Sequence, residues 1–137
     1  MTLVLPEFPS KLSVSQRMRA TLAVGIAKLL RRASPKRIRS VLRLISAGAE
    51  PSAYEQAKQA RDEILTASPY CRGGEACLVR SLATALYCRM RGYWPTWSVG
   101  VLAVPPFAAH AWVEAEGRIV DEPLSATDYR AFFKVAV

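Results

Sequence analysis

Apolar residues recur at three- and four-residue steps through the first half of the chain, a pattern typical of amphipathic helices. Within residues 13–33 they are Val14, Met18, Leu22, Ile26, Leu29 and Leu30. They form one face of a first helix, the kind of face that normally packs on a core. The sequence therefore predicts an amphipathic helix in this segment.

Capping signals mark the helices that follow. Ser34 as N-cap and Pro35 at the first helical position begin a second helix, which Gly48 ends. A capping-box pattern at residues 52–55 begins a third helix, which runs to about residue 67. Residues 77–91 contain no Gly or Pro and predict a fourth, which begins after a Gly-Gly loop.

The periodicity changes in the second half. Residues 96–104 and 110–120 are rich in Val, Trp and Ile with partial alternation, and residues 132–137 suit a last strand. Glu116-Gly117 supplies a hairpin turn. Helices followed by strands predict an α+β fold with a mainly antiparallel sheet, in which residues 1–137 form a single domain.

Charge divides the chain into two parts. The formal net charge is +8, and residues 11–43 hold ten Lys and Arg and no Asp or Glu. The chain from residue 48 onward is nearly neutral. A basic helical region at residues 11–48 suggests an acidic peptide, a protein partner, nucleic acid or an anionic surface. No nucleic-acid motif or base-stacking platform supports the third option.

The chain has only three cysteines, Cys71, Cys77 and Cys88. A small secreted domain stabilised by disulfides normally has more cysteines, and an even number of them. The spacing of these three cysteines also lacks the C-x-x-C pattern of structural zinc sites, so we expect no metal and no other cofactor. We find no signal-peptide pattern and no apolar run long enough to span a bilayer. These features favour a cytoplasmic protein with reduced thiols.

Three residues suit nucleophilic catalysis. Cys77 begins the predicted fourth helix, where free N–H groups and the helix dipole favour a thiolate. His110 is the only histidine in the chain. A hairpin turning at Glu116-Gly117 places Asp121 diagonally across from His110, on the face that Trp112 shares. A Cys-His-Asp triad needs this arrangement.

Structural explanations compete with this reading. A cysteine in a helix is often a small buried hydrophobe, and a histidine in a strand is often structural. A shift of one residue in the hairpin would exchange Asp121 for Glu122. Pattern alone therefore leaves a non-catalytic peptide-binding module open beside an enzyme.

Four segments carry a resemblance to a known family: CLVRSLA at residues 77–83, RGYWPTW at 91–97, PFAAHAWVE at 106–114 and VDEP at 120–123. Together they resemble the stand-alone leader peptidases of lasso-peptide biosynthesis, the peptidase half of the B protein. The resemblance covers nearly the whole chain. It implies a papain- or transglutaminase-like fold, with residues 70–137 as the catalytic core and a cysteine-bearing helix packed on the sheet.

The resemblance further implies an activity and its residues. Cys77 would be the nucleophile, His110 the general base and Asp121 the orienting acid in cleavage of a ribosomally made precursor peptide between leader and core. The partners would be a small leader-binding protein and an ATP-dependent lactam cyclase. We expect Trp112, Arg80, Arg31 and Arg32 to contact substrate or partner. The alternative on the same triad is another acyl transfer, such as transglutamination or amide hydrolysis.

Overall fold

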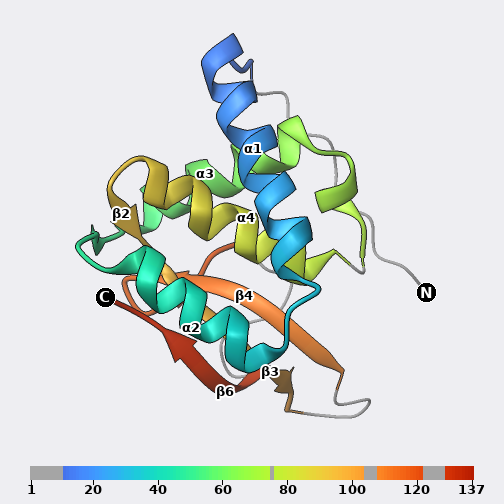
Figure 1. The fold of residues 1–137 in the computed structure, drawn as a ribbon, viewed down its shortest axis with the longest axis vertical. Helices are drawn as coiled ribbons and strands as arrows, with labels where there is room; N and C mark the ends of the chain where they lie inside the picture. Colours follow the sequence, from blue (N-terminus) through green and yellow to red (C-terminus); the bar gives the residue numbers. More distant parts are fainter. Residues whose placement is uncertain (1–10, 75, 104–107, 122–128) are drawn as a thin grey trace.

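The computed structural model describes residues 11–74, 76–103, 108–121 and 129–137 (Figure 1). In this part of the chain four α-helices precede a four-stranded antiparallel sheet, so the α+β prediction is confirmed. The helices are α1 (Val14–Leu30), α2 (Pro35–Ser46), α3 (Tyr54–Ala67) and α4 (Cys77–Met90). The sheet contains β3 (Thr96–Leu102), β4 (Ala109–Ala115), β5 (Arg118–Ile119) and β6 (Tyr129–Val135), in the order β5-β4-β3-β6.

Three small elements were not predicted. β1 (Glu50–Pro51) pairs in parallel with β2 (Tyr93–Trp94), and a short 3-10 helix, η1 (Tyr70–Arg72), precedes α4. Elements of two or three residues leave almost no periodic signal in a sequence. No helix in the described part of the chain is long and apolar enough to cross a membrane.

Caps fix where the helices begin. Ser34 is the N-cap of α2, and its hydroxyl accepts a hydrogen bond from the Arg37 N–H at 3.3 Å, as predicted. For α3 the predicted cap is wrong by one residue, since the N-cap is Ala53. Ala53 has no side-chain acceptor for the free N–H groups of the first turn. A carboxylate from the β4–β5 hairpin supplies one, because Glu116 Oε2 accepts a hydrogen bond from the Tyr54 N–H at 2.7 Å. This bond joins the hairpin to the start of α3.

The helix α4 forms the centre of the fold. It lies between α1, α3 and the sheet and contacts β4 and β3 (Figure 1). Every residue from Val79 to Cys88 is buried. Trp97 of β3 is buried against it and donates its indole N–H to the Ser81 hydroxyl at 3.0 Å. Because α4 is held by neighbours along its length, its first residue has a fixed position relative to the sheet.

The rotation of α1 about its axis differs from the prediction. Val14, Met18, Leu22 and Leu29, expected on the packed face, are 78%, 67%, 56% and 68% exposed. The buried side chains are instead Ala20, Ala23, Val24 and Ala27. The predicted apolar face of α1 therefore points largely into solvent.

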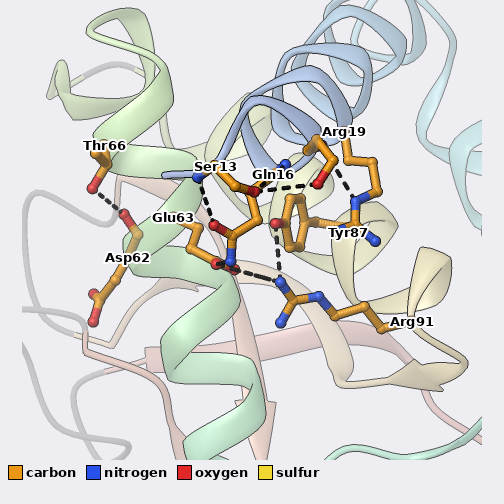
Figure 2. Close-up of polar contacts among 9 residues, drawn as sticks. Ser13, Gln16, Arg19, Asp62, Glu63, Thr66, Tyr87 and Arg91 are labelled. Atoms are coloured by element: carbon orange, nitrogen blue, oxygen red, sulfur yellow. Dashed lines mark hydrogen bonds and ion pairs between the residues drawn. The ribbon is translucent and has the colours of Figure 1, made fainter. Parts of the chain in front are cut away.

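Packing and a polar network explain this rotation. Small alanine side chains let α1 approach α3 and α4 closely, since helix separation depends on the side chains at the contact. Gln16 of α1 donates to Glu63 Oε1 at 2.8 Å, and Glu63 of α3 pairs with Arg91 at 3.1 Å (Figure 2). Glu63 is only 4% exposed. A buried charge of this kind requires partners, so it holds Gln16 on the inward side.

The sheet has the predicted hairpin and one close backbone contact. Ala115 pairs with Arg118 across Glu116 and Gly117, whose φ values of 54° and 74° suit a tight two-residue turn. On the other side of β4, the central strand β3 pairs with both β4 and β6, and its register with β6 shifts between Val99 and Gly100. A Cβ at Gly100 would lie 2.0 Å from the Arg130 carbonyl oxygen. Only glycine fits there without moving β6.

Candidate active site

Cys77 is the first residue of α4, as predicted. Its N-cap, Ala76, offers no side-chain hydrogen bond to the helix start. The N–H groups of the first turn and the positive end of the helix dipole therefore act directly on a group placed there. The thiol is half-buried, so it is shielded from bulk water but reachable.

Arg80 fixes the segment that leads into this helix. Its Nη1 donates to the Cys71 carbonyl at 3.0 Å and to the Gly73 carbonyl at 3.3 Å. The side chain is only 5% exposed. These bonds tie the loop before α4 to the first turn of the helix and put a positive charge near Cys77. The predicted contact of Arg80 with substrate or partner stays a prediction.

β4 presents an open edge to Cys77. The Val120 N–H donates to the Val113 carbonyl at 3.0 Å, so Val113 faces the β5 side of the strand. Ala111, two residues earlier, faces the same side. Within the described residues, β5 pairs with β4 only at Glu114 and Ala115. The Ala111 N–H is thus available to Cys77, and a hydrogen bond between them lowers the pKa of the thiol.

His110 completes the pair. Cys77 and His110 share a side-chain hydrogen bond that lowers the pKa of the thiol. Both line a cavity of about 150 Å³, together with Leu78, Val99, Ala109 and Ala111. The structure therefore brings together two residues 33 positions apart that the sequence predicts as nucleophile and base.

The electrostatics favour a thiolate at Cys77. Burial raises the pKa of this thiol, but the hydrogen bonds from His110 and Ala111 and the charges of His110 and Arg80 act in the opposite direction. The net result is a pKa below the ordinary value. Cys77 thus has the property that a nucleophilic thiol requires.

The other two cysteines have the opposite property. Burial raises the pKa of the Cys71 thiol, and it raises the pKa of the Cys88 thiol to about 12. Both side chains are completely buried. Cys71 and Cys88 are therefore inert core residues, in accord with the structural explanation for a cysteine in a helix.

An aromatic stack surrounds His110. The Tyr129 ring of β6 lies 4.9 Å from the His110 ring, with an interplanar angle of 12°. Trp112 lies 5.8 Å from His110 and 4.9 Å from Tyr129. Gly100 of β3, which lies between β4 and β6, has no side chain to keep these rings apart. Ring faces stabilise a nearby cation, so the stack suits a histidine that becomes charged.

Glu114 holds Trp112 in place. Its indole N–H donates to Glu114 Oε2 at 3.1 Å, and Ser98 and Lys134 contact the same oxygen at 2.7 and 2.9 Å. Burial raises the pKa of Glu114, but Lys134, Ser98 and Trp112 outweigh it and keep the pKa below the ordinary value. Trp112 is 2% exposed. Its observed role is to pack against His110, and its predicted contact with substrate is untested.

Asp121 follows the hairpin, whose register is the predicted one. It accepts a hydrogen bond from Tyr54 Oη at 3.3 Å and forms an ion pair with Lys58 Nζ at 3.4 Å. Its φ of 45° turns the chain away from the strand direction. The alternative carboxylate, Glu122, lies outside the described residues. The structure thus ties Asp121 to α3, and its predicted contact with His110 stays a prediction.

The other two residues predicted to contact substrate or partner, Arg31 and Arg32, follow the C-terminal end of α1. Arg31 and Arg32 are both exposed, and Arg31 donates to Tyr70 Oη at 2.6 Å.

Tyr129 was not predicted as a site residue, because a tyrosine 19 residues after the histidine has no local signal of contact with it. Among the described residues, no group of three or more His, Cys, Asp and Glu is arranged to hold a metal ion.

Comparison with known proteins identifies the family. Residues 20–136 match the family model of the transglutaminase-like superfamily. We found no match among curated proteins and none among solved structures. Members of this family usually carry a Cys-His-Asp catalytic triad. The match covers most of the chain and includes α4 and the sheet, and the chain therefore belongs to the transglutaminase-like superfamily.

Proposed function

We propose that this protein is a cysteine endopeptidase that cleaves the leader from a ribosomally synthesised lasso-peptide precursor. The observation that carries the chemistry is the Cys77–His110 contact at the start of α4, with a thiol pKa below the ordinary value. The family supports acyl transfer at a cysteine. The choice of substrate rests on the sequence resemblance described above.

The reaction proceeds in two steps. Cys77 Sγ attacks the carbonyl carbon of the last leader residue, and the N–H groups at the start of α4 are placed to stabilise the oxyanion. The C–N bond breaks as His110 gives its proton to the leaving amine of the core. Water, deprotonated by His110, then attacks the thioester and releases the leader with a free carboxylate.

Other side chains position this pair. Asp121 is proposed as the carboxylate that orients His110, because the hairpin register places it opposite Trp112 and therefore diagonal to His110. Tyr129 and Trp112 stack on the imidazole and favour its charged form during the reaction. The half-buried cavity at Cys77 then holds the residues beside the cleaved bond.

The proposal also includes partners. A small leader-binding protein presents the precursor, and an ATP-dependent cyclase closes the lactam on the freed amine. The exposed basic residues Arg31 and Arg32 are proposed to contact one of them. Cleavage itself needs no cofactor in this mechanism, because nucleophile, base and oxyanion donors all belong to the chain.

The test incubates the full chain with a precursor peptide and a leader-binding protein, which we expect in neighbouring genes, and follows the products by mass spectrometry. We expect two products whose masses sum to that of the precursor plus one water, and no products with Cys77→Ala. An intact precursor after incubation with both proteins would contradict the peptidase. Loss of ammonia with attachment of an amine would instead support transglutamination on the same residues.

A further inference from the structure

The outward face of α1 carries an apolar strip that no described residue covers. We define the strip as Val14, Met18, Leu22 and Leu29, which are between 56% and 78% exposed. Steps of four and seven residues place all four on one side of the helix. Contiguous exposed apolar surface on a folded protein marks a site of interaction.

The shape of the strip favours a protein over a lipid surface. A hollow of about 480 Å³ opens at its N-terminal end, lined by Leu12, Val14, Arg17, Met18, Thr21 and Leu22. A side chain from a partner can fill such a hollow, whereas a flat membrane surface leaves it empty. The helix also has no Phe, Tyr or Trp, the residues that commonly anchor helices at a membrane interface.

The positive charge around the strip favours an acidic partner. Arg17 and Arg19 are exposed and adjoin Met18, so they lie on opposite flanks of the strip. Residues 11–49 contain ten Lys and Arg and no acidic residue. A partner that covers the strip therefore meets positive charge on both sides, and acidic residues on that partner would be favoured.

The length of the strip matches one helix. From Val14 to Leu29 it extends about 22 Å, roughly four turns, and it is one row of side chains wide. We propose that the strip binds an acidic amphipathic helix of a partner protein. The apolar face of that helix covers Met18 and Leu22, and its carboxylates lie against Arg17 and Arg19. This proposal does not depend on the chemistry at Cys77.

The test measures binding of a synthetic probe to the full chain by fluorescence anisotropy. The probe is a fluorescein-labelled helical peptide of about 18 residues, with leucine along one face and glutamate on both flanks. We expect it to bind the wild type and to bind Met18→Ser/Leu22→Ser at least ten-fold more weakly. Arg17→Glu/Arg19→Glu should weaken it to a similar extent.

The matched controls lie on α2. Leu44 is 80% exposed and Arg37 is also exposed, so Leu44→Ser and Arg37→Glu change the same residue types away from the strip. Both should bind the probe like the wild type. The double variants should unfold at the wild-type temperature, because the altered side chains lie in solvent, and this excludes misfolding as the cause of weaker binding.

Any of the following results would overturn the proposal. The first is equal binding of a peptide with the same composition in scrambled order, or equal binding by the strip variants. The second is binding of phosphatidylserine vesicles without binding of the probe. The third is a dimer in sedimentation that Met18→Ser/Leu22→Ser dissociates, because the strip would then join two copies of this chain. The fourth is tighter probe binding by Leu3→Ser/Leu5→Ser, because residues 1–10 would then occupy the strip.

Discussion

Cys77→Ala and, separately, His110→Gln are each expected to lower the rate of precursor cleavage about 10⁶-fold. The reason is that the thiol and the imidazole act as one unit. Without Cys77 no thioester forms, and without His110 the thiol loses the hydrogen bond and the charge that lower its pKa. Cleavage rates are measured from product masses over time, with the leader-binding protein present.

The double variant shows whether Cys77 and His110 act as one catalytic unit or contribute independently to the cleavage rate. Cys77→Ala/His110→Gln should be no slower than the slower single variant, since residues that act together are non-additive. Cys88→Ala is the matched control, because Cys88 is a buried thiol of the same helix with a pKa raised to about 12. It should retain cleavage. Multiplication of the two single losses in the double variant would contradict a common mechanism.

Gly100→Ala is expected to lower the free energy of unfolding by about 3 kcal/mol. The new Cβ would lie 2.0 Å from the Arg130 carbonyl oxygen and 2.7 Å from the Ala131 Cα. Both are backbone atoms, so no side-chain rotation relieves the contact and β6 must shift. Chemical denaturation of the full chain measures this loss.

Gly25→Ala provides the control for the same substitution. Gly25 lies within α1 and a Cβ there would meet nothing within 4 Å. Because alanine favours a helix more than glycine does, this variant should be more stable by up to about 1 kcal/mol. If Gly100→Ala matched Gly25→Ala, the close approach of β3 and β6, and with it the placement of Tyr129, would be wrong.

Local signals explain why much of the site was predictable. The start of α4 at Cys77 depends on a Gly-Gly loop and a following run without Gly or Pro. The β4–β5 register depends on Glu116-Gly117, whose backbone conformation is set within two residues. Each of these features is determined by neighbours in sequence, and the structure confirms both.

Features that depend on tertiary packing were not predictable. The hydrogen bond from the Ala111 N–H to Cys77 lies beyond the part of β4 that β5 pairs with in the described residues. Tyr129 reaches His110 across a central strand that has glycine at the point of approach. Strand length and strand order, which the sequence does not reveal, decide both contacts.

The error in α1 has a physical cause as well. Hydrophobic periodicity ranks Val14, Met18 and Leu22 above the alanines, so the larger residues were placed on the packed face. In the fold, close packing of alanines against α4 and the buried Glu63–Gln16 bond decide the rotation instead. A helix with apolar residues on two faces can bury only one of them here.

Alkylation tests, without any substrate, whether His110 holds Cys77 as a reactive thiolate. The rate of iodoacetamide labelling at each cysteine is measured from pH 5 to pH 10 by peptide mass mapping. We predict that Cys77 is labelled far faster than Cys71 and Cys88, with a pKa below the ordinary thiol value. In His110→Gln, burial then dominates and this pKa moves upward. An unchanged Cys77 profile in His110→Gln, or a wild-type pKa at or above the ordinary value, would contradict the account.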